Sequence, residues 1–301
     1  MNVLTDFGIG RGAPGGGLRL NAEVNTRVAV TGVSGSLGSL VAERVADLDP
    51  VLLARDPARA PGWANDVRAC DYSDESAVSM GLADVAVVLM VSAAETADRP
   101  AVHRTFVDAA ARTGVQHIVY TSFASASSTA TFTFARDHAD TEEALRDSGV
   151  AYTILRNNLY ADLAPYIGGE SGVIRGPAGS GRLAPVARAD IAEVAAAVLR
   201  SPAAHAGKTY LLTGPESMTM TELAARTAEA VGRPMRFEDE SVEDAYRWRR
   251  AEFEAQPWEI DGWVTTYTAI ADGSMSEVSD DIERVIGRPA RSLEETLGNP
   301  A

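Results

Sequence analysis

The sequence is poor in two reactive residue types: its 301 residues include a single cysteine, Cys70, and a single lysine, Lys208. One cysteine excludes an intramolecular disulfide and a cysteine metal cluster. Because Cys70 ends an apolar stretch, we expect a small core residue rather than a nucleophile. No apolar run is long enough to cross a membrane, and the N-terminus lacks the charged-then-apolar order of a signal peptide. We therefore expect a cytoplasmic protein.

Positive charge is scarce as well. Lysine and arginine together number 27 against 42 acids, which gives a net charge of −15. This balance argues against binding of nucleic acid or of an anionic membrane, but it does not exclude a local basic pocket for a phosphate. His103, His117 and His205 have no metal-ligand spacing with acids, so we expect no metal site. The expected partner is a small-molecule substrate, and the chain itself is expected to be a monomer or a homodimer.

The most informative stretch is RVAVTGVSGSLG, residues 27–38. A β-branched run ends in Thr31, the glycines Gly32, Gly35 and Gly38 follow at a spacing of three, and a helical pattern begins at once. This order suits a dinucleotide, because bare backbone can approach a pyrophosphate and a helix N-terminus offers free N–H groups. The alternative is an ordinary strand-to-helix turn, which seldom needs three glycines.

Strand and helix patterns alternate from Arg27 onward, which predicts an α/β fold with a doubly wound, Rossmann-like parallel sheet. Strands are expected at 27–31, 50–54, 67–70, 85–91, 116–121, 151–155 and 209–213, and helices at 36–47, 74–81, 100–113, 137–148 and 189–200. Asp190 is placed to cap the last of these helices.

The alternation loosens after Asn158, where glycine-rich loops begin. We expect a dinucleotide-binding domain over 27–158, with its sheet completed by 189–214. Residues 159–188 and 215–301 are expected to form a smaller C-terminal substrate lobe at the carboxyl ends of the strands, where open α/β sheets bind ligands. Residues 1–26 contain the glycine-rich run GIGRGAPGGG and are expected to form a flexible tail.

The end of the second strand indicates which cofactor is used. Arg55 stands there, at the place where an NAD site usually has an acid. A guanidinium suits a 2′-phosphate, so NADP(H) is favoured over NAD(H). Asp56 leaves open the alternative that Arg55 forms a plain surface ion pair. Asp71 and Tyr72, after the third strand, are placed to meet the adenine, although Asp71 equally suits a helix or turn cap.

Small and hydroxyl-bearing residues follow the fourth and fifth strands. Val91 and Ser92 are small enough to pass beneath the cofactor's ribose. The fifth strand ends in YTSF, residues 120–123, and hydroxyls at this edge face the ligand crevice. Thr121 is expected beside the cofactor, and Ser122 could hydrogen-bond a substrate carbonyl. The alternative for Ser122 is a hydroxyl bonded to nearby backbone.

These motifs resemble the short-chain dehydrogenase/reductase superfamily, and within it the atypical NmrA-like group of the NAD(P)H:quinone oxidoreductase type. The resemblance extends from about residue 27 to near residue 297 and depends on TGVSGSLG (31–38), Arg55, YTS (120–122), EEALRDSGVAYTILRNNLY (142–160) and RADIAEVAAAVL (188–199). It implies that the pyrophosphate is held by Gly32, Ser34, Gly35, Ser36, Leu37 and Gly38. It also implies that Arg55 holds the 2′-phosphate, that Asp71 and Tyr72 border the adenine, that Ser122 lies beside the nicotinamide and that Asn157 and Asn158 line its end of the site.

The chain departs from the family at the usual catalytic pair. Most active members have a Tyr-x-x-x-Lys pair after the fifth strand, and those places here hold Phe134 and His138. Lys208 is the only lysine and lies elsewhere, so the usual machinery for carbonyl reduction is absent. His138 could bond a ribose hydroxyl or donate a proton near neutral pH. Its alternative is a histidine on the helix surface.

A quinone substrate would explain how the protein can work without the Tyr/Lys pair. Hydride addition to a quinone gives an aromatic hydroquinone anion, which is stable enough to take its proton from water. Phe123, Phe134, Tyr160 and Trp248 are expected to line an apolar substrate pocket, with core packing as the alternative for Phe134 and for the tryptophans.

The sequence therefore favours an NADPH-dependent reductase of a quinone or a related conjugated carbonyl, with Ser122 and His138 as catalytic residues. One alternative is a non-catalytic NAD(P) sensor, because some NmrA-like proteins are regulators. Another is a reductase, dehydratase or epimerase of a specialised pathway.

Overall fold

A computed structural model describes residues 26–298 of the chain. Its largest sheet has seven strands, all parallel, in the order β3-β2-β1-β4-β5-β6-β9. These strands are β1 (Val28–Thr31), β2 (Val51–Ala54), β3 (Asp66–Ala69), β4 (Val87–Met90), β5 (His117–Phe123), β6 (Ala151–Asn157) and β9 (Thr209–Leu212). The fold class and all seven predicted strands are confirmed. The predicted tail lies, apart from Thr26, outside the described residues.

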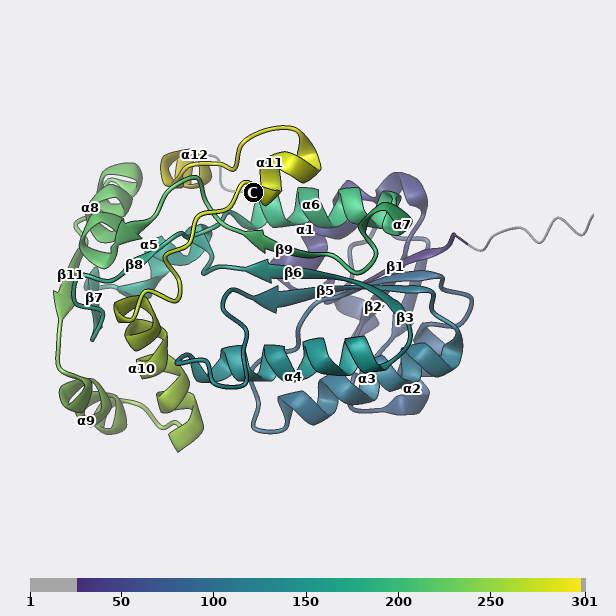
Figure 1. Ribbon diagram of the computed structural model, residues 1–301, viewed down its shortest axis with the longest axis horizontal. Helices are drawn as coiled ribbons and strands as arrows, with labels where there is room; N and C mark the ends of the chain where they lie inside the picture. Colours follow the sequence, from purple (N-terminus) through teal and green to yellow (C-terminus); the bar gives the residue numbers. More distant parts are fainter. Residues whose placement is uncertain (1–25, 299–301) are drawn as a thin grey trace, which may run out of the picture.

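Helices cover both faces of this sheet (Figure 1). They are α1 (Ser36–Arg44), α2 (Glu75–Gly81), α3 (Arg99–Thr113), α4 (Thr133–Asp147) and α6 (Arg188–Arg200). One apolar cluster joins the sheet to α1 and α6, and a second joins it to α2, α3 and α4. Since both faces are covered, the strand residues are apolar in continuous runs, such as the fully buried VVLM of β4.

A smaller part of the chain lies beyond the carboxyl ends of the strands (Figure 1). It holds two short sheets, in which β7 (Val173–Gly176) pairs with β11 (Arg236–Asp239) and β8 (Arg182–Leu183) with β10 (Met218–Thr219). Its helices are α5 (Ala164–Ile167), α8 (Met220–Val231), α9 (Val242–Glu252), α10 (Pro257–Ala271) and α12 (Leu293–Gly298), while α7 (Pro202–His205) and α11 (Asp281–Ile286) pack near α6 and β9. This part has an apolar cluster of its own, which α4 joins.

Helix α4 begins four residues earlier than the pattern predicts, at Thr133 rather than at 137. No side chain of its own first turn caps it. The Thr133 N–H instead donates to the Thr265 hydroxyl of α10, at 3.2 Å. The cap comes from a distant helix, which explains why a local sequence signal failed to show it.

The predicted cap role of Asp190 is wrong. Helix α6 has Ala187 at its N-cap, and its first N–H, that of Arg188, donates to the Asp162 carboxylate at 2.9 Å. Asp190 is fully buried, and its carboxylate accepts from the Arg291 N–H and the Arg288 guanidinium, each at 2.7 Å, and also from the Arg291 guanidinium. The residue therefore ties the C-terminal segment to the main sheet's helix layer.

Replacing Asp190 by alanine is expected to lower the free energy of unfolding by about 2–4 kcal/mol, because three hydrogen bonds to a buried carboxylate are lost. Urea unfolding measures this change. Glu193→Gln is the matched control, since Glu193 binds the same arginines from a partly exposed position, and its effect should stay below about 1 kcal/mol. If Asp190→Ala lowers the free energy of unfolding no more than the control does, Asp190 does not hold the C-terminal segment in place.

Candidate functional site

The turn from β1 into α1 is a backbone cradle. Gly32 has a φ of +65°, which disfavours any other residue. A Cβ on Gly38 would lie 2.3 Å from the Gly32 carbonyl oxygen, so only glycine lets helix and turn approach this closely. Gly35 precedes α1 and offers no side-chain cap, which leaves the first N–H groups of the helix available to an anion. The cradle thus fits a pyrophosphate.

A cavity of about 440 Å³ extends from this cradle along the carboxyl edge of β1, β2, β3 and β4. It lies where the strand order reverses between β1 and β4, the usual ligand crevice of such a sheet. Eight of the predicted cofactor residues line it: Gly32, Ser34, Gly35, Arg55, Asp71, Tyr72, Val91 and Ser92. The start of the loop after β4, residues 91–93, was predicted to pass beneath the ribose, but its continuation through Ala94, Thr96 and Asp98, which also lines the cavity, was missed; its only signal was its place after a central strand.

The remaining predicted cofactor residues do not line this cavity. Leu37 is in the apolar core beneath α1, Gly38 packs on the turn, and Ser36 faces a neighbouring cavity. The Thr121 hydroxyl accepts from the Ser92 N–H at 2.8 Å, which holds the loop after β4 in place.

Arg55 is exposed at the cavity and forms no ion pair or side-chain hydrogen bond with any residue of 26–298. The Asp56 carboxylate instead accepts from the Ala58 N–H at 3.1 Å, so it does not neutralise Arg55. Asp71 accepts from the Ser73 N–H and hydroxyl, and these hydrogen bonds, helped by the nearby charge of Arg55, lower the pKa of Asp71. The helix cap is Asp74. Arg55 is thus a free cation at the predicted 2′-phosphate position.

Tyr72 anchors the base of the cavity. Its hydroxyl contacts the Thr31 hydroxyl and lies 2.9 Å from the Val91 carbonyl oxygen, and burial raises the pKa of this phenol. The Thr31 hydroxyl also accepts from the Val91 N–H at 2.9 Å. These bonds hold the ends of β1 and β4 together beneath the place expected for the ribose.

His138 lies inside the protein between two partners. Its Nδ1 is 2.8 Å from the Tyr120 hydroxyl, and its Nε2 is 3.3 Å from the Arg99 guanidinium. Because arginine only donates, Nε2 accepts and Nδ1 carries the proton. Burial, with the charge of Arg99, lowers the pKa of His138 well below 6.5. Neither ring nitrogen is free, so the predicted roles of proton donor and ribose ligand each require one of these bonds to break.

Ser122 also has a strong partner. Its hydroxyl donates to the Glu142 carboxylate at 2.7 Å, and Glu142 accepts as well from Arg156 and Arg146. Burial alone would raise the pKa of Glu142, but the hydrogen bonds from Arg156 and Ser122 outweigh it and the net pKa is lowered. Ser122 therefore meets a carboxylate rather than backbone, and can offer a ligand only its oxygen lone pairs.

The two asparagines after β6 differ in what they can still bind. The Asn158 amide donates to the Met275 carbonyl at 2.9 Å, and its oxygen accepts from the Leu159 N–H. The Asn157 amide is buried and no hydrogen bond of good geometry reaches it from residues 26–298; the same holds for Nε and Nη1 of Arg99, although Nη1 lies 3.9 Å from the Asp137 carboxylate. Burial raises the pKa of Tyr160, and an interaction with the Asn157 side chain opposes this rise, so the Asn157 amide lies beside that phenol. An unpaired amide fits the carboxamide of a nicotinamide.

A second cavity, of about 570 Å³, is largely apolar and lies in the smaller part of the chain. Its aromatic lining consists of Tyr160, Trp248, Phe253, Trp263 and Tyr267. Two of the four predicted pocket residues, Tyr160 and Trp248, are among them. The other two, Phe123 and Phe134, pack on Phe132 in an adjoining cluster, with ring centroids 4.9 and 5.5 Å away.

Comparison with known proteins decides the family. A model of an NAD(P)H-binding family matches residues 32–202, and quinone oxidoreductase 2 of Escherichia coli is 33% identical over 291 residues, covering 90% of this chain and 98% of that protein. The chain belongs to the NAD(P)H-binding, NmrA-like short-chain dehydrogenase/reductases. It is an NAD(P)H-dependent oxidoreductase.

Solved structures agree with this assignment. The Escherichia coli quinone oxidoreductase in complex with NADPH matches with a TM-score of 0.80, covering 90% of this chain and 98% of that one. The triphenylmethane reductase of Citrobacter is 31% identical, with a TM-score of 0.77 and the same coverage. No helix within residues 26–298 has the length and apolar character needed to span a bilayer.

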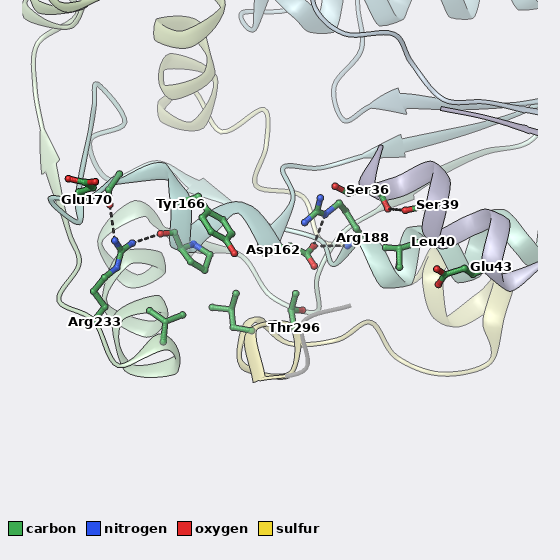
Figure 2. Close-up of a pocket in the computed structure, with 14 residues that line it drawn as sticks. Ser36, Ser39, Leu40, Glu43, Asp162, Tyr166, Glu170, Arg188, Arg233 and Thr296 are labelled. Atoms are coloured by element: carbon green, nitrogen blue, oxygen red, sulfur yellow. Dashed lines mark hydrogen bonds and ion pairs between the residues drawn. The ribbon is translucent and has the colours of Figure 1, made fainter. Parts of the chain in front are cut away.

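A third and larger hollow, of about 920 Å³, separates α1 from α5, α8 and α12. Figure 2 shows that some of its polar side chains bind neighbouring protein groups: Arg233 donates to the carbonyls of Gly169 and Pro165, and Asp162 accepts from the Arg188 N–H. Of the predicted cofactor and substrate residues, Ser36 alone is in the lining of this hollow.

Proposed function

We propose that this oxidoreductase transfers hydride from NADPH to a planar aromatic acceptor, a quinone or a related conjugated carbonyl. One observation carries the proposal: a cavity with a pyrophosphate cradle lies at the carboxyl edge of the large sheet, and an apolar, aromatic cavity lies in the part of the chain beyond that edge, with Asn157 at the end of β6 and Tyr160 of the apolar cavity three residues further on. This is the arrangement that two ligands meeting at one reacting point require.

The chain's own groups would hold the cofactor as follows. The N–H groups at the start of α1 bind the pyrophosphate, and Arg55 binds the 2′-phosphate, for which NADPH is preferred over NADH. Asn157 pairs with the carboxamide. The bound cofactor supplies a hydride from its nicotinamide. The NADPH complex of the Escherichia coli relative supports this choice.

A quinone suits a site that lacks the Tyr/Lys pair. The quinone gains two electrons and a proton as hydride, NADPH becomes NADP⁺, and the resulting hydroquinone anion takes its second proton from water. This product is a weak base, so no tuned acid is needed. The aromatic walls of the apolar cavity exclude water and orient the ring.

The test is oxidation of NADPH by menadione, a neutral naphthoquinone, followed by loss of the reduced nicotinamide absorbance. We expect turnover, with one hydroquinone formed per NADPH consumed. Tight binding of NADPH and NADP⁺ with similar affinity and no turnover with any quinone would overturn the proposal and favour a cofactor sensor, the alternative suggested by the buried His138.

A further inference from the structure

The apolar cavity has charged side chains of one sign only. Among its lining residues the charged ones are Arg175 and Arg249, and no acid lines it. This is unexpected in a chain with a net charge of −15. Arg175 is half exposed at 52%, whereas Arg249 is only 4% exposed.

Arg249 is held rigidly in the cavity wall. One guanidinium nitrogen donates to Glu240 at 2.9 Å and to the Ala245 carbonyl at 3.0 Å, and the other donates to the Arg175 carbonyl at 2.8 Å. Glu240 also accepts from the Trp248 indole at 2.7 Å, so a single carboxylate fixes both the arginine and the tryptophan. Three of the five N–H groups of the guanidinium are used in this way, and no residue of 26–298 accepts from the Nε–H or from the second N–H of Nη2, so this rigid cavity-lining residue keeps donors for a bound group.

The same guanidinium lies against the π faces of the cavity. Its carbon is 4.4 Å from the centroid of the Trp248 ring and 5.6 Å from that of Tyr267. These faces would otherwise attract a cationic ligand. With Arg249 in that place, a cationic aromatic loses this attraction and meets like charge instead, whereas an anionic oxygen gains a charge-assisted hydrogen bond.

We infer that Arg249 selects the acceptor by charge: the cavity takes planar aromatics that bear an anionic oxygen, accepts neutral ones, and discriminates against cationic ones. This inference rests on the proposed function, since it takes the apolar cavity as the acceptor site. Arg175 adds a weaker attraction at the cavity rim. Arg249 acts here as a specificity-determining residue that contacts the acceptor.

Three probes test the inference: lawsone, a naphthoquinone whose hydroxyl is ionised at neutral pH, menadione, which is neutral, and malachite green, a cationic triphenylmethane dye. Binding to the cofactor-free protein is measured by quenching of tryptophan fluorescence.

The variants are chosen to separate charge from folding. Because Arg249 supports Glu240, the main variant is the double substitution Arg249→Met with Glu240→Gln, which removes both charges of the pair. Arg175→Gln is a second variant; because Arg175 is half exposed and its side chain pairs with the partly exposed Glu238, its loss should cost little stability. Arg182→Gln, on the neighbouring β8 and outside the cavity lining, is the control.

We expect the double variant to bind lawsone at least about tenfold more weakly than the parent, because one charge-assisted hydrogen bond is lost. Its affinity for menadione should stay within about threefold of the parent's. It should bind malachite green as tightly as the parent does, or more tightly. Arg249→Lys should restore only part of the lawsone affinity, because a lysine lacks the rigid fork. Arg175→Gln should weaken lawsone alone, by about two- to threefold. Arg182→Gln should change none of the three.

Equal losses for all three probes in the double variant would show a merely structural role and overturn the inference, as would lawsone affinity that depends on neither arginine. Turnover of menadione without charge selection would overturn the inference and leave the proposed function standing. If lawsone binding depends on the arginines but no quinone is turned over, the inference about charge stands and the proposed function is overturned.

Discussion

Replacing Arg55 by serine is expected to weaken NADPH binding about 10- to 100-fold, because a guanidinium–phosphate pair contributes roughly 1.5–3 kcal/mol. NADH lacks the 2′-phosphate, so its affinity should change less than about twofold. Since Arg55 has no protein partner within residues 26–298, its removal leaves no buried charge behind and the fold should be unaffected. Isothermal titration with each cofactor measures both affinities.

Arg112→Ser is the matched control for this experiment, because Arg112 is an exposed arginine of α3 that pairs with Glu75. It should alter neither affinity. Equal weakening of NADPH and NADH by Arg55→Ser, or no change in either, would contradict the assignment of Arg55 to the 2′-phosphate. Arg59, a turn further along the chain, would then be the next residue to substitute.

Replacing Gly38 by alanine is expected to weaken NADPH and NADH equally, by about 100-fold, since the turn must open and about two charge-assisted hydrogen bonds to the pyrophosphate are lost. The added Cβ would lie 2.3 Å from the Gly32 carbonyl oxygen and 2.7 Å from that of Thr31, and neither backbone group is the end of a flexible side chain. The same overpacking should cost about 2–3 kcal/mol of stability. Cofactor titration and urea unfolding measure the two effects.

Ser39→Ala serves as the control for Gly38→Ala. Ser39 is the next residue of α1, and its side chain bonds only the Ser36 carbonyl, at 3.1 Å. Its substitution should leave both affinities within about twofold of the parent. Unchanged cofactor binding in Gly38→Ala would show that the turn from β1 to α1 does not hold the pyrophosphate.

Much of the fold could be predicted because its signals are local. Each strand of the large sheet is a short apolar run, and the helices between the strands repeat apolar residues at helical spacing. The exceptions concern residues whose partners are distant in sequence. The start of α4 is set by Thr265 of α10, and Asp190 meets arginines about a hundred residues away. A local pattern carries no information about such partners.

The same distinction applies to the site. Gly32, Gly38 and Arg55 could be singled out as candidates from their places after strands, because backbone approach and a phosphate-binding cation are requirements within one strand–turn–helix unit, and the structure brings Gly32 and Arg55 to one cavity. The hydrogen-bond partners of Ser122 and His138 could not be predicted in this way. Ser122 binds Glu142 of α4, and His138 binds Arg99 of α3 and Tyr120 of β5, all of them distant in sequence. Adjacent asparagines with identical chemistry differ only in what folding brings beside them: Met275 meets Asn158, and Asn157 is left unpaired.

The order of apolar runs, glycines and charges along the chain was by itself enough to determine the parallel sheet, to predict a place for the dinucleotide and to show that the usual Tyr/Lys pair is absent. Only the tertiary structure decided which polar groups stay unpaired, and that Arg249 lies against the aromatic walls of the apolar cavity. The reason is physical. Backbone conformation and helix or strand periodicity depend on neighbours in sequence, whereas hydrogen-bond pairing, burial and local charge depend on neighbours in space.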